Sequence, residues 1–149
     1  MITYQIAPGA TDVSVVLRII DSTDGTPETG VVFNTSGIDL EYRREGEAST
    51  DITEATLAAL TTAHTDGGFL HIGNGLYRLD LPDAACASGV AGVLVHGIVT
   101  GMVVIPCYIQ LQGAVNKIYS DTTIIYSDTT IATSKATQIY SDTAIASSK

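Results

Sequence analysis

A seven-residue repeat at the C-terminal end of this 149-residue chain limits what the chain can fold into. The sequence IYSDTTI occurs at 118–124 and again at 125–131, ATSKATQ follows at 132–138, and IYSDTAI occupies 139–145. A repeat this short has no interior of its own, so its apolar side chains can be buried only against other copies of the segment. Residues 117–149 are therefore predicted to form an oligomerisation stalk.

If the tail is helical, one apolar or small residue of each heptad lies along the same side of the helix. A residue four positions later lies beside it, and the two positions together form the contact seam with partner helices. Ile combined with small or β-branched residues in such a seam favours three helices over two, so the stalk is predicted to be a parallel trimeric coiled coil. The predicted oligomerisation residues are Ile118, Thr122, Ile125, Thr129, Ala132, Ala136, Ile139, Thr143 and Ala146.

Two other tail structures stay open. Ile, Tyr, Thr, Ser and Asp are weak helix formers, and several of them suit strands, so an intertwined β stalk is the main alternative. Disorder is the third possibility. A period of seven would move successive repeats to opposite faces of a flat strand, which favours the coiled coil.

Residues 1–111 are predicted to be mainly β, because Gly, Thr, Ser, Val and Ile are abundant and short alternating segments are separated by turn residues. The fold expected from this pattern is an antiparallel β-sandwich of immunoglobulin-like type. Residues 112–116 would be a hinge to the stalk. Strands are expected at 2–6, 12–20, 31–33, 37–43, 69–72, 76–81, 90–99 and 102–111.

Several local features of the first 111 residues carry finer predictions. Asp51 and Glu54 fit a capping box, which predicts one or two helical turns within 51–60. Asp83 is a candidate cap for another helical turn. Gly73-Asn74-Gly75 is predicted to be a tight turn between the strands 69–72 and 76–81. Segments 90–99 and 102–111 are predicted to form a hairpin. Its second strand should expose an edge or a bulge at Pro106, and it should bury Val103, Ile105, Cys107, Ile109 and Leu111 on one face.

The run GLYRLDLPDAACASGVAGVLVHGIVTGMVVIPCYIQLQ at 75–112 resembles a module of tailed-bacteriophage structural proteins, in which a YRLDLPDA strand precedes a hairpin ending in IQL. The IYSDTT heptads resemble the stalks of phage fibre and appendage proteins. This resemblance implies a trimeric virion structural protein, and it transfers no functional residues.

Charge is distributed unevenly along the chain, whose formal net charge is −9. Residues 1–116 contain four Arg and 13 acidic residues, whereas three Asp balance the three Lys of the tail. Nucleic acids and anionic membranes require clustered cations, so neither is an expected partner. No signal peptide or transmembrane segment is apparent, and synthesis in the host cytoplasm is expected.

No catalytic motif appears, so neither enzymatic activity nor a cofactor is expected. His64, His71 and His96 lack metal-ligand spacing, and His96 is expected to be a packed, hydrogen-bonded residue. Cys86 and Cys107 are predicted to be free, buried thiols. A set of acidic residues is expected to form a solvated face and not a calcium site: Asp39, Glu41, Glu45 and Glu47.

These observations predict a homotrimeric virion fibre or decoration protein. Its partners would be its own copies and other virion proteins of the capsid or of the tail and baseplate. The alternative is an adhesin module that binds host-surface glycans, which would need a concave surface with aromatic side chains.

Overall fold

The computed structural model describes residues 1–112 and 133–135. Residues 133–135 have helical backbone and are exposed. Most of the predicted hinge, 113–116, and all nine predicted oligomerisation residues lie outside the described residues. The first compact unit of the chain runs from Met1 to Gln112.

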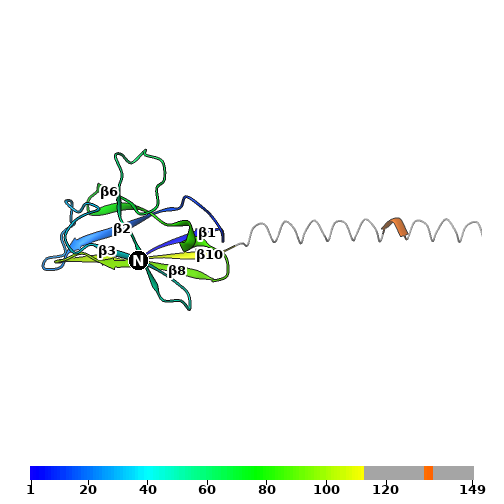
Figure 1. The fold of residues 1–149 in the computed structure, drawn as a ribbon. Helices are drawn as coiled ribbons and strands as arrows, with labels where there is room; N and C mark the ends of the chain where they lie inside the picture. Colours follow the sequence, from blue (N-terminus) through cyan, green and yellow to red (C-terminus); the bar gives the residue numbers. More distant parts are fainter. Residues whose placement is uncertain (113–132, 136–149) are drawn as a thin grey trace, which may run out of the picture. The chain divides into compact units, whose positions relative to one another are not determined.

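This unit contains two five-stranded sheets, which lie over one another as two layers (Figure 1). Sheet 1 has the order β1-β10-β8-β3-β4, with bounds Ile2–Ile6, Cys107–Leu111, Gly92–Ile98, Asp39–Arg44 and Ser49–Ile52. Sheet 2 has the order β5-β6-β7-β2-β9, with bounds Ala55–Thr56, Gly68–Gly73, Leu76–Asp80, Ser14–Asp21 and Met102–Ile105.

The predicted mainly-β class is confirmed, but both sheets are mixed and not purely antiparallel. The N-terminal strand β1 runs parallel to β10, with Ile2 opposite Cys107 and Ile6 opposite Leu111. The two-residue strand β5 runs parallel to β6. Alternation along a strand indicates which side chains are buried but not the direction of the neighbouring strand, so the sequence could not predict these parallel pairs.

Side chains from both sheets fill one hydrophobic core between the layers. Sheet 2 contributes alternate residues of β2 and β7, and sheet 1 contributes alternate residues of β3, β8 and β10, as a period of two requires. The largest fully buried side chains are Tyr77, Leu17, Ile19, Leu40, Ile52, Leu79, Leu81, Ile109, Val15, Val31, Val93 and Val95.

The predicted strand 102–111 is divided at Pro106 between the two sheets. The predicted hairpin of 90–99 with 102–111 is therefore wrong for 102–105, whereas 107–110 pairs antiparallel with 92–95 as predicted. β9 pairs with β2 in sheet 2, whereas β10 pairs with β8 and β1 in sheet 1. Val104 and Cys107 are buried, but Val103 is 45% exposed. The inner faces of the two sheets point toward each other. When the chain passes from sheet 2 to sheet 1, the inward side therefore changes from even-numbered residues such as Val104 to odd-numbered residues such as Cys107.

Two other local predictions are also wrong. Residues 31–33 form no strand, and segment 51–60 contains strand and loop residues with no helix. Glu54 does not cap a helix, because its carboxylate accepts a hydrogen bond from the Leu40 N–H at 2.8 Å. This contact stabilises sheet 1, so a partner distant in the sequence replaces the local capping interaction.

The tight turn between β6 and β7 and the helical turn after β7 are confirmed. Asn74 has a φ of 50°, a left-handed conformation that Asn tolerates and that two-residue hairpin turns require. The 3-10 helix η1 spans Asp83–Cys86, but no side chain caps it. The Asp83 carboxylate instead accepts a hydrogen bond from the Asp12 N–H at 3.0 Å, away from the helix.

A buried ion pair anchors the loop that follows β5. Asp80 is fully buried, and its carboxylate accepts hydrogen bonds from Arg78 at 2.7 and 2.8 Å and from the Ser14 hydroxyl at 2.6 Å. Burial alone raises the pKa of Asp80, but the bonds from Arg78, Ser14 and the Thr65 N–H outweigh it and hold the pKa below its ordinary value. The ionised carboxylate is therefore the form that the fold stabilises.

We expect Asp80→Asn to lower the free energy of unfolding by about 3 kcal/mol at pH 7, because Arg78 loses its charged partner. The native-state pKa of Asp80 lies below the unfolded one. The stabilisation is therefore complete above about pH 3.9 and is lost as the pH falls through the native-state value. Chemical denaturation at pH 7 and pH 3 measures both effects. Glu45→Gln, at an exposed carboxylate, is the control, and an equal loss in both variants would contradict the assignment.

Candidate functional site

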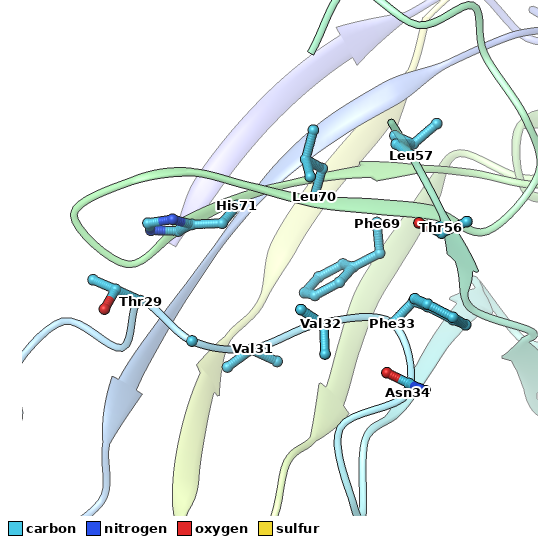
Figure 2. A pocket seen from close by; sticks show the side chains of 11 residues that line it. Thr29, Val31, Val32, Phe33, Asn34, Thr56, Leu57, Phe69, Leu70 and His71 are labelled. Atoms are coloured by element: carbon cyan, nitrogen blue, oxygen red, sulfur yellow. The ribbon is translucent and has the colours of Figure 1, made fainter. Parts of the chain in front are cut away.

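An apolar pocket with a volume of about 290 Å³ lies beside the outer edge of β6. Figure 2 shows β6 on one side and the extended segment 29–34 on the other, with Phe69 and His71 directed toward that segment and Leu70 directed away. The lining residues are Thr29, Gly30, Val31, Val32, Phe33, Asn34, Thr56, Leu57, Phe69, Leu70 and His71.

The pocket exists because β5 is too short to cover the edge of β6. β5 pairs only with Gly68 and Phe69, so the rest of β6 has no strand on that side. Alternate residues of a strand direct their backbone groups to the same edge, so the N–H and C=O of His71 face the open side, like those of Phe69. Segment 29–34 lines the pocket across from β6.

Tyr77 holds segment 29–34 in place from the core. Its hydroxyl donates a hydrogen bond to the Glu28 carbonyl at 2.8 Å and accepts one from the Val31 N–H at 3.3 Å. Burial raises the pKa of Tyr77, and so its hydroxyl stays protonated at neutral pH. The Tyr77 ring is stacked on Phe69 with centroids 5.0 Å apart, which fixes one wall of the pocket.

His71 is the most polar side chain at the pocket. Its ring lies 4.9 Å from that of Tyr77, and its Nε2 atom is buried with no hydrogen-bond partner in the described part of the chain. The hydroxyls of Thr29 and Thr56 and the amide of Asn34 are the remaining side-chain hydrogen-bonding groups. The pocket can therefore take an apolar group and offer a few polar contacts at its rim.

Of the other two histidines, His96 is hydrogen-bonded as predicted but is only half-buried, with Nε2 3.2 Å from the Ser49 hydroxyl and Nδ1 3.6 Å from Glu41. The Nε2 of His64 lies 3.2 Å from the Val13 carbonyl, and its Nδ1 lies 3.4 Å from Asp12. The structure brings neither ring to the pocket.

Cys86 and Cys107 are buried and free, as predicted. Burial raises the pKa of the Cys107 thiol to about 12 and also raises that of Cys86. Both thiols are therefore protonated at neutral pH, the form that packs as a small hydrophobe.

The predicted acidic face is confirmed for Asp39, Glu45 and Glu47, which are exposed, whereas Glu41 is half-buried beside His96. Within residues 1–112 and 133–135, no group of three or more His, Cys, Asp or Glu side chains is arranged to hold a metal ion. No helix in these ranges is long and apolar enough to cross a membrane.

Comparisons of the chain with protein-family models, curated proteins and solved structures found no match. Sequence reasoning also identified no residue of the pocket as a binding candidate. The one available signal was the apolar run Val31-Val32-Phe33, which was interpreted as a strand and in fact lines the pocket from a loop.

We expect Tyr77→Phe to release segment 29–34 and to lower the free energy of unfolding by about 1–3 kcal/mol, because the Val31 N–H loses its buried acceptor. Amide hydrogen exchange at Val31 and denaturant unfolding measure the two effects. Tyr108→Phe is the matched control, since the Tyr108 hydroxyl makes no hydrogen bond within residues 1–112. Unchanged exchange at Val31 in Tyr77→Phe would show that the hydroxyl does not hold the segment.

Proposed function

We propose that this chain is a non-enzymatic virion structural protein of a tailed phage, assembled as a homotrimeric fibre or decoration protein. The observation that carries the proposal is the heptad repeat, whose apolar positions can be buried only by other copies of the chain. The proposed role of the β unit is to dock on the capsid or on the tail and baseplate. The resemblance of 75–112 and of the heptads to phage structural proteins supports this setting.

The way the β unit ends suits a domain that bears load from a stalk. β10 lies between β1 and β8, so both of its edges are paired. The Leu111 N–H donates to the Ala91 carbonyl at 2.9 Å, and the Gln112 N–H donates to the Ile6 carbonyl at 3.0 Å. The chain is thus hydrogen-bonded up to Gln112, the first residue of the proposed hinge.

A trimer would also explain how a small domain could hold a particle firmly. Each β unit has a modest surface for docking, but three units joined by one stalk would bind with a high effective concentration after the first contact. Loss of the stalk would then weaken particle binding without altering the docking surface.

We expect the full chain to be a trimer in solution and Ile125→Asp to convert it largely to monomers. Each seam Ile contributes roughly 1.5–3 kcal/mol through burial, and the substitution would bring three carboxylates together. Native mass spectrometry measures the oligomeric state of each variant. Asp128→Asn, outside the predicted seam, is the control. A wild-type chain that stays monomeric at high concentration would contradict the proposed stalk.

The pocket beside β6 favours a second candidate function, binding to a host-surface glycan. It provides a concave surface with Phe33, which is 36% exposed, and with hydroxyl and amide groups nearby. Aromatic faces and a few polar groups are what sugar recognition requires.

If the pocket binds glycans, we expect Phe33→Ala to weaken binding about tenfold, the factor that 1.4 kcal/mol represents. A glycan array followed by calorimetry with the full chain measures this loss. Val103→Ala, on another face of the domain, is the control. Absence of any glycan ligand, or equal weakening by both variants, would leave the structural role as the sole proposal.

A further inference from the structure

One edge of β6 has backbone groups that no described part of the chain uses. Phe69 is the last residue of β6 that β5 covers. Two residues later, the N–H and C=O of His71 face the same edge and make no hydrogen bond within residues 1–112 and 133–135. An open edge is a template for another strand, and proteins commonly protect it with charged side chains or Pro. The sequence of β6, GFLHIG, contains neither.

The side chains next to this edge are apolar on both sides of β6. On the inner side is the pocket, where Phe69 and His71 point toward a wall that includes Val32, which is 54% exposed (Figure 2). On the outer side, Leu70 is half-buried and Ile72 is 41% exposed. A strand added to this edge would place alternate side chains in the pocket and beside Leu70 and Ile72. Apolar residues would therefore suit both of its faces.

The unmet polar groups indicate what kind of ligand fits this edge. His71 has, besides its free N–H and C=O, a buried Nε2 atom with no hydrogen-bond partner among the described residues. An extended peptide has N–H and C=O groups that repeat at the spacing of a strand edge, so one or two of its residues can bond to both backbone groups of His71. A sugar or a lipid chain has no such repeat. The edge therefore favours a peptide.

Size and charge narrow the chemistry of this peptide. A volume of about 290 Å³ is close to the lower limit for small-molecule sites, roughly 300 Å³, so the pocket suits one large side chain. No Lys, Arg, Asp or Glu lines it, so this side chain should be apolar. Residues 1–112 contain 13 acidic residues and four Arg. Basic residues on either side of the apolar ones would therefore be attracted to the β unit.

We propose that the β unit docks on the virion by pairing the open edge of β6 with an extended segment of another virion protein. The segment has apolar residues at its centre, one of which enters the pocket, and Lys or Arg on either side. This inference rests on the proposed docking role and names the surface and the partner chemistry for it. Pairing over so few residues is weak, and a trimer would strengthen it through effective concentration.

The test uses three synthetic peptides of the sequence Lys-Thr-Val-X-Val-Thr-Lys with blocked ends, in which X is Phe, Leu or Ile. With the full chain, we expect at least one of them to bind with a dissociation constant below about 1 mM by calorimetry. In the free chain the His71 amide should exchange its hydrogen rapidly. The bound peptide should slow this exchange about tenfold or more, because the N–H gains an acceptor.

Backbone methylation of the peptide separates strand pairing from simple apolar binding. An N-methyl group removes one N–H and leaves every side chain in place. At X it removes the N–H that faces β6 in an antiparallel pair, and at the following Val it removes the one that faces β6 in a parallel pair. We expect one of these two peptides to bind about tenfold more weakly and the other to bind like the parent. Equal affinities of the two would contradict pairing.

Variants of the protein test the pocket. We expect Val32→Ser to weaken peptide binding about fivefold, because it removes apolar surface from the pocket wall. Val103→Ser is the matched control, since Val103 is similarly exposed and lies on another face of the domain. Equal weakening by both variants would show that the pocket does not receive the peptide.

The remaining outcomes separate this inference from the proposed function. Failure of all three peptides to bind would overturn it, and so would a His71 amide that is already protected because another copy covers the edge. A glycan that binds at Phe33 while no peptide binds would favour the glycan candidate instead. A trimer that binds no peptide would keep the proposed homotrimer and lose this surface. A monomer that binds the peptides would contradict the trimer and support the edge pairing.

Discussion

The crossing at Pro106 is the constraint on which the rest of the β unit depends. One continuous segment pairs in sheet 2 through β9 and in sheet 1 through β10, so the two layers are joined covalently at a residue with no N–H to donate. The crossing also reverses the inward positions, which buries Val104 and Cys107 in one core and leaves Val103 and Ile105 on the outer side of sheet 2. The same crossing thus determines which residues of 102–111 enter the core and which lie on the outer side of sheet 2.

The tail leads to the conclusion about assembly. Its heptads have apolar positions that a single chain has no means to bury, so other copies of the chain would have to cover them. The β unit, in contrast, fills one hydrophobic core between its own two sheets. Assembly is therefore proposed to depend on the tail.

The sequence predicts strands well where one side is solvated, as in 39–44 and 107–111, since strict alternation marks the buried residues. It predicts the turn at Asn74 from local chemistry. It does not reveal which sheet a strand joins, so the division at Pro106 and the parallel pairing of β1 were missed. Segment 31–33 was wrongly predicted to be a strand, because an apolar loop held by the distant Tyr77 hydroxyl has the same composition as a strand. For the same reason, no residue of the pocket was predicted to bind a ligand.

The central claim is that the apolar positions of the heptads are buried by other copies of the chain. Sedimentation equilibrium of the full chain over a wide range of concentrations tests this most directly. The account predicts a species with three times the mass of the 15.5 kDa chain. A mass that stays at 15.5 kDa at every concentration would contradict it.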